Sequence, residues 1–128
     1  MGGMGAPERT AVDVVVPAAS AAAHILRTTA VSLASSQLDL DRLDDLALAV
    51  AETTVELLAL EGATRLAMTI DRDGHGLDMA LFAEGPTRPD WKDRWERSLS
   101  AQVLSVLAEE VTAEAGADGR GVRFRFQA

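Results

Sequence analysis

The pattern of apolar and polar residues predicts ordered structure from residue 11 onward. The run VDVVV at residues 12–16 is rich in β-branched residues and precedes Pro17, which is typical of a strand. Residues 18–35 carry spaced apolar side chains among alanines, and proline suits the first turn of a helix, so a helix is predicted there. Residues 1–10 are glycine-rich and unpatterned, and we expect a flexible tail before one domain of residues 11–128.

A second helix, beginning after Asp39, has the strongest pattern in the chain. Asp39 is the predicted N-cap, and further acids follow in the early turns, where the positive helix terminus favours them. Leu48 and Val55 widen the apolar face, which predicts burial on more than one side. Gly62 is expected to end the helix at the position after its C-cap.

The second half of the chain predicts three strands and one helix. Residues 64–71 and 77–84 are the first two strands, and residues 121–127 form the last one, where apolar residues alternate with arginines. A third helix is predicted over residues 95–114, with these side chains facing inward: Leu99, Val103, Val106, Leu107 and Val111. The order β-α-α-β-β-α-β predicts an α/β fold, a two-layer sandwich of helices on a sheet.

Composition and charge exclude several classes of function. Hydrophobic residues make up 48% of the 128, enough for one core. Twenty acidic against twelve basic residues give a net charge of -8, which opposes direct binding to a nucleic acid backbone. The chain has no cysteine, so disulfides, thiolate metal sites and cysteine nucleophiles are excluded. No apolar run approaches the ~18 residues of a membrane span and no leader pattern is present, so we expect a cytoplasmic protein without membrane contact.

Several candidate motifs favour structure over chemistry. The segment DRDGHG at residues 71–76 joins two predicted strands, so a hairpin turn is favoured over a phosphate-binding loop. His24 and His75 lack partners at metal-ligand spacing, and no metal site is expected there. Trp91 and Trp95 lie in a charged loop that leads into a helix. They anchor this loop on the core or form a contact for a partner protein.

Glu52 and Glu56 are the candidate catalytic pair. They lie four residues apart on one face of the second helix, among small and apolar neighbours, so we expect partly desolvated carboxylates. A desolvated Glu52 would have the raised pKa that suits a general base. The alternative is an acidic stripe that faces solvent, and spacing alone favours that alternative.

Three segments are similar to one protein family. Residues 50–56 read V-A-E-T-T-V-E, similar to the family phrase V-S-E-A-V-T-N; residues 25–33 contain Arg27, and residues 103–111 read VLSVLAEEV. Over roughly residues 12–126 the chain resembles anti-sigma factors of the RsbW/SpoIIAB type, bacterial serine kinases with the GHKL (histidine-kinase-like, or Bergerat) ATPase fold. The resemblance implies that Glu52 is the general base and that Glu56 replaces an asparagine that holds Mg²⁺. It also implies that Arg27 contacts a sigma factor.

The nucleotide-binding motifs of that family are altered in this chain. Its D-x-G-x-G motif reads A-E-G-P-T here: Ala83 replaces the aspartate that hydrogen-bonds adenine, Gly85 is kept, and Thr87 replaces the second glycine. A second motif, G-x-G, reads S-L-S at residues 98–100, and its side chains would crowd amides that approach phosphates. The resemblance therefore implies a degenerate member without normal ATP binding and without a cofactor.

These observations favour a regulator over an enzyme. We expect an anti-sigma-like protein that sequesters a sigma factor or pairs with an anti-sigma antagonist, and that forms a homodimer through its first strand and helix, as the family implies. The alternative is an active serine/threonine kinase using ATP and Mg²⁺. Glu52 would then take the serine proton, Glu56 would help hold the metal, and residues 85–92 would close over the nucleotide. A third reading is a sensor or scaffold with a small-molecule pocket where the nucleotide would sit.

Overall fold

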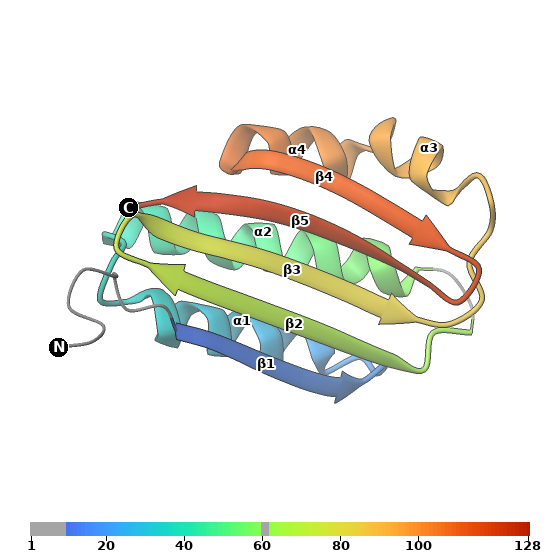
Figure 1. Cartoon of the computed structure of the whole chain (residues 1–128), viewed down its shortest axis with the longest axis horizontal. Coiled ribbons are helices and arrows are strands. Elements are labelled where there is room, and N and C mark those ends of the chain that lie inside the picture. Colours follow the sequence, from blue (N-terminus) through green and yellow to red (C-terminus); the bar gives the residue numbers. More distant parts are fainter. Residues whose placement is uncertain (1–9, 60–61) are drawn as a thin grey trace, which may run out of the picture.

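The computed structural model describes residues 10–59 and 62–128, which form a five-stranded antiparallel sheet covered on one face by helices. Figure 1 views the sheet from its uncovered side, with α1 and α2 behind it. The strands lie in the order β1-β2-β3-β5-β4. In chain order the elements are β1 (Thr10–Pro17), α1 (Ala22–Ala34), α2 (Leu40–Leu58), β2 (Arg65–Asp73), β3 (Gly76–Glu84), α3 (Trp91–Glu96), α4 (Leu99–Leu107), β4 (Glu109–Gly116) and β5 (Gly119–Gln127).

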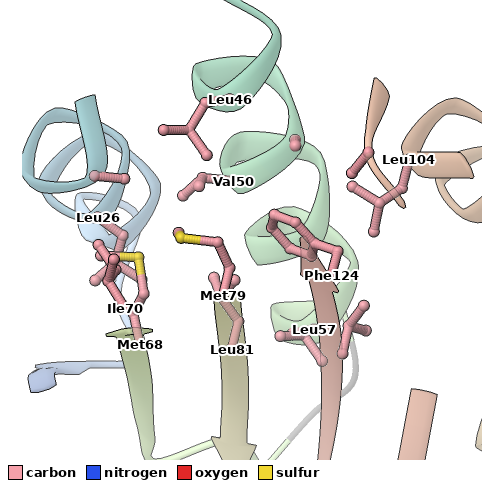
Figure 2. Close-up of a cluster of buried hydrophobic side chains, with 14 of the residues drawn as sticks. Leu26, Leu46, Val50, Leu57, Met68, Ile70, Met79, Leu81, Leu104 and Phe124 are labelled. Carbon is pink, nitrogen blue, oxygen red and sulfur yellow. The ribbon is translucent and has the colours of Figure 1, made fainter. Parts of the chain in front are cut away.

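The core lies between this sheet and the helices that cover it. Side chains alternate along each strand, and the inward set packs against α1, α2 and α4. Figure 2 shows side chains from these helices above those of β2, β3 and β5. The labelled members are Leu26, Leu46, Val50, Leu57, Met68, Ile70, Met79, Leu81, Leu104 and Phe124. The predicted α/β sandwich of two layers is confirmed.

The segment DRDGHG forms the predicted hairpin turn. β2 ends at Asp73 and β3 begins at Gly76, with the two residues paired across the turn. One carboxylate oxygen of Asp73 accepts hydrogen bonds from the backbone N–H groups of His75, at 2.7 Å, and Gly76, at 3.0 Å. These two amides are therefore satisfied by the protein itself, and the pairing of the strands confirms the hairpin interpretation of this motif.

The predicted third helix over residues 95–114 is wrong. The chain instead forms two short helices, α3 and α4, followed by a strand, β4, that pairs with β5. Ser98 begins the second of these helices, because its hydroxyl oxygen accepts a hydrogen bond from the N–H of Ala101 at 3.1 Å. The element order is therefore β-α-α-β-β-α-α-β-β.

The helical spacing of apolar residues in this region misled the prediction. Leu99 and Val106 were expected inside, yet they are 74% and 86% exposed. Beyond α4 the spacing of apolar residues also fits a strand, since Val111 and Ala113 alternate with polar neighbours. Without that strand, one edge of β5 would expose its unpaired backbone groups.

Several predicted boundaries and faces also change. The first helix begins at Ala22, four residues later than expected, because the chain turns after β1. The second helix has the predicted Asp39 cap but ends at Leu58, before Gly62. Its outer residues Leu48 and Val55 are 45% and 62% exposed, so its burial on further sides is not observed. The expected tail lies outside the described residues, except that β1 begins at residue 10.

Candidate functional site

The two glutamates of α2 meet α4 at one serine. The Ser100 hydroxyl oxygen lies 3.4 Å from a carboxylate oxygen of Glu52 and 3.4 Å from one of Glu56. Both glutamates are half-buried. Ser100 belongs to the S-L-S segment that stands at the family's second glycine motif. The structure thus brings the candidate general base and the candidate Mg²⁺ ligand together beside this altered motif.

Arg120 lies directly opposite Ala83, the residue at the adenine-binding aspartate of the family. The two residues are paired across β3 and β5, so their side chains share the face of the sheet that the helices cover. Both are fully buried, with 0% exposure. At the position where the resemblance implies a carboxylate, this chain has a methyl group, and an arginine of the neighbouring strand is paired with it.

The guanidinium of Arg120 is held by the end of α2 and by the loop that follows β3. Its Nε and Nη2 groups donate to the carbonyl oxygen of Leu57 at 3.0 and 2.6 Å. Its Nη1 group donates to the carbonyl oxygen of Pro86 at 3.2 Å and to the Thr87 hydroxyl at 3.3 Å. Burial lowers the pKa of Arg120. The side chain fills the space between the sheet and the end of α2, and it ties the 85–87 loop to that helix.

Gly85 has a structural role in this loop. Its φ of +150° is one that other residues rarely adopt, and a Cβ atom there would lie 2.5 Å from the carbonyl oxygen of Gly62. Its N–H donates to the carbonyl oxygen of Asp118 at 2.9 Å. The retained glycine is thus explained by a close backbone contact within the fold. Its predicted role in binding nucleotide receives no support from this geometry.

Ser98 is likewise committed to local structure. Besides accepting from the Ala101 N–H, its hydroxyl donates to the carbonyl oxygen of Trp95 at 2.6 Å. The S-L-S segment is therefore the beginning of a helix whose first turn is closed by a side chain.

The residues present do not fit ATP bound in the family's manner. No carboxylate stands at Ala83 to accept the adenine amino group, and the guanidinium of Arg120 occupies the buried space beside it. The retained Gly85 lies close to the backbone of Gly62, and its N–H already donates to the carbonyl oxygen of Asp118. That N–H is therefore not free to bind a phosphate. A carboxylate at Glu56 would also add negative charge beside a triphosphate. In the described residues no group of three or more histidine or acidic side chains could hold a metal ion.

Trp91 and Trp95 anchor α3 on the core. They are 5% and 3% exposed, and their rings stack with centroids 6.0 Å apart and planes inclined by 14°. Of the two interpretations open from the sequence, the anchoring one is confirmed. A pocket of about 190 Å³ lies beside them and is lined by Glu56, Ala59, Arg88, Asp90, Arg94 and the two tryptophans.

Arg27 lies on α1, outside the group of residues described above. Its side chain is exposed, and its Nη2 group lies 3.1 Å from the Nδ1 atom of His24. Arg27 is thus available for contact with a partner.

His24 and His75 are both exposed and belong to no metal-ligand cluster in the described part of the chain.

The sequence interpretation missed Arg120, although a signal for it was present. The alternation in the last strand places Val122, Phe124 and Phe126 inward, as predicted, and residue 120 is in phase with them. The predicted strand began one residue too late to include it. An arginine in phase with three buried apolar residues indicates a buried cation with a specific partner.

A crystal structure of the RsbU and RsbW domains of Rv1364c from Mycobacterium tuberculosis is similar to this chain, with a TM-score of 0.67 and 14% sequence identity. The similarity covers 91% of this chain and 32% of that one. The two share a fold. The present chain thus spans about a third of the length of that solved chain. No protein-family model matches the sequence, and neither does any curated protein. Among the described residues no helix is long and apolar enough to cross a membrane.

Proposed function

We propose that this protein is an anti-sigma-like regulator that acts by binding another protein, without ATP in the family's usual site. The partner is a sigma factor or an antagonist of an anti-sigma factor. The observation that carries the proposal is the buried guanidinium of Arg120, which fills the space beside Ala83 and bonds the end of α2. A fold shared with a structure that contains an RsbW domain supports the choice of partner class.

The proposed mechanism is occlusion, in which the regulator covers a surface that its partner needs. Affinity would come from packing and from charge complementarity, since a chain of net charge -8 suits a basic partner. We assign Arg27 to the contact surface, because its guanidinium is exposed on α1 and interacts only with the neighbouring His24 among the described residues.

A binding titration with the sigma factors and antagonists of the source cell tests this function. We expect one of them to bind the wild-type protein and the Arg27→Ala variant to bind it about tenfold more weakly, as for an arginine at an interface hot spot. Arg123→Ala is the matched control, because its exposed side chain lies on the uncovered face of the sheet. Failure of every candidate to bind would overturn the proposal.

A serine/threonine kinase is the second candidate, favoured by the convergence of Glu52 and Glu56 at Ser100. In that case Glu52→Gln would abolish phosphate transfer from ATP to an antagonist protein while partner binding persisted. Under the proposal above, the wild-type protein transfers no phosphate to any partner that it binds.

We also propose a homodimer. β1 is an edge strand of the sheet, paired only with β2 in the described part of the chain, and such an edge is a template for a second copy. Sedimentation should then give twice the mass of the 13.5 kDa chain. A single-copy mass at all concentrations would contradict this proposal.

A further inference from the structure

The outer face of α2 carries large apolar side chains that no other described element covers. Leu48 and Val55 are 45% and 62% exposed, although their spacing made them resemble core residues. They are seven residues apart, which is close to two helical turns, so they lie on one side of the helix about 10 Å apart along its axis. α2 is the central helix of the layer, with α1 and α4 packed beside it. The exposed stripe therefore faces away from the sheet.

Acidic residues share this stripe. Asp41, Asp44 and Glu52 stand at three- or four-residue steps with the two apolar positions, so all five residues lie on one face. The first two are exposed and Glu52 is half-buried. This outer stripe of α2 thus combines apolar contact area with negative charge.

The one basic residue of α2 does not neutralise the stripe. Arg42 turns away from it, with its guanidinium carbon 4.6 Å from the centroid of the Phe126 ring and its Nη1 group donating to the carbonyl oxygen of Leu107 at 3.1 Å. α4, the neighbour on one side, has no charged residue at all. The outer stripe therefore presents its negative charge to solvent without a cation of its own helix.

We propose that the outer stripe of α2 binds a basic amphipathic helix of a partner protein. Apolar residues two turns apart on the partner would pack on Leu48 and Val55, because helices that pack side by side match this spacing. Lysine or arginine residues beside them would pair with Asp41, Asp44 and Glu52. A second copy of this chain is the poorer occupant, since it would bring two sets of carboxylates together. The inference rests on the proposed function, because it names the surface that the regulator presents.

A synthetic peptide tests the surface directly. The probe is an 18-residue amphipathic helix with leucines seven residues apart and flanking lysines, labelled for fluorescence anisotropy at low salt. We expect micromolar binding to the wild-type protein, weakening as salt is raised. Val55→Lys and Leu48→Lys should each weaken binding at least tenfold. Equal binding by these variants, or equal binding of a peptide with glutamates in place of the lysines, would overturn the proposal.

Val15→Lys is the matched control. Val15 is 57% exposed, similar to Val55, but it lies in β1 between inward-facing neighbours and therefore faces the uncovered side of the sheet. This variant should bind the peptide as the wild-type protein does. All three variants replace exposed side chains, and circular dichroism checks that each has the wild-type helix content. Loss of binding in the control as well would mean that added positive charge anywhere suffices, which contradicts a defined surface.

The natural partner separates failure of this surface from failure of the proposed function. If Val55→Lys still binds a partner that Arg27→Ala has lost, the proposed function holds and the α2 surface is wrong. If no sigma factor or antagonist binds the wild-type protein, the proposed function fails, and the peptide titration alone decides the surface. If sedimentation shows a dimer that Val55→Lys dissociates, a second copy covers this face and the proposal is overturned.

Discussion

Two threonine hydroxyls are buried in α2 without a hydrogen-bond partner in the described part of the structure. Thr53 and Thr54 are both 0% exposed, and neither hydroxyl oxygen forms a hydrogen bond there. An unsatisfied buried hydroxyl costs about 1–3 kcal/mol of stability. Both residues lie between Glu52 and Glu56 in the chain. The unsatisfied hydroxyls therefore lower the stability of the helix segment that carries the candidate site.

Thr54→Val should therefore stabilise the protein. The substitution keeps the shape of the side chain and removes the unpaired hydroxyl, so we expect the free energy of unfolding to rise by about 1 kcal/mol. Urea denaturation measures it. Thr54→Ser is the control, because it keeps the hydroxyl and removes a buried methyl group, and it should destabilise the protein. A valine variant less stable than the wild type would show that the hydroxyl has a partner.

Arg120 should also contribute strongly to the stability of the folded protein. Arg120→Met keeps most of the buried volume but removes the donors to Leu57 and Pro86, leaving carbonyl groups unsatisfied near the end of α2. We expect a loss of about 2 kcal/mol in the free energy of unfolding. Arg120→Lys keeps the charge but not the forked geometry, so its free energy of unfolding should lie between those of the wild type and the methionine variant. Equal stability of the methionine variant would contradict the role assigned to this residue.

At the residue scale, the sequence predicts relative positions best where spacing along one element decides them. Glu52 and Glu56 converge because helix geometry places residues four apart on one face. Their shared contact with Ser100 required the packing of α4 on α2, which no local pattern contains. Arg120 was missed for a similar reason, since its partners belong to α2 and to the loop after β3.

At the scale of elements, the β2–β3 hairpin carries a titratable group with a defined role. The hydrogen bond from the His75 N–H lowers the pKa of Asp73, and Arg125, at 3.5 Å, acts in the same direction. The ionised form is thus favoured by folding. Its stabilisation is present in full above the pKa of an unfolded aspartate, about 3.9, and is lost as the pH falls through the lower pKa of the folded protein.

Asp73→Asn tests this dependence on pH. The variant keeps an acceptor oxygen but carries no charge, so it should be less stable than the wild type at neutral pH. The difference in melting temperature should shrink as the pH falls below about 4. Thermal unfolding monitored by circular dichroism at several pH values measures it. A difference that stays constant down to about pH 2.5 would show that the charge of Asp73 does not stabilise the hairpin.

Elements with one dominant pattern were predictable, and those with two were not. The alternation in β2, β3 and β5 and the period of α2 agree with the structure. The apolar residues of segment 95–114 are spaced so that they fit one continuous helix and equally a helix followed by a strand. The choice between them depends on whether β5 has a neighbour on both sides, which is a property of the sheet. The exposure of Leu48 and Val55 has the same origin, because it depends on which helix faces have neighbours.

At the scale of the whole molecule, the fold and the altered motifs carry different information. The α/β layers follow from the order of the elements, and they agree with a structure of only 14% identity. A fold alone does not assign an activity. The proposal of a regulator without ATP depends on the space near Ala83, where the fully buried Arg120 stands at the paired position of β5.

Calorimetric titration of the purified protein with Mg-ATP and Mg-ADP, up to millimolar nucleotide, tests this central claim most directly. The account predicts no heat of binding and no shift in melting temperature for either nucleotide, because Arg120 fills the space beside Ala83. Binding in the micromolar range would contradict it. The guanidinium would then have to leave its site for adenine to enter, and the kinase candidate with Glu52 as its base would take first place.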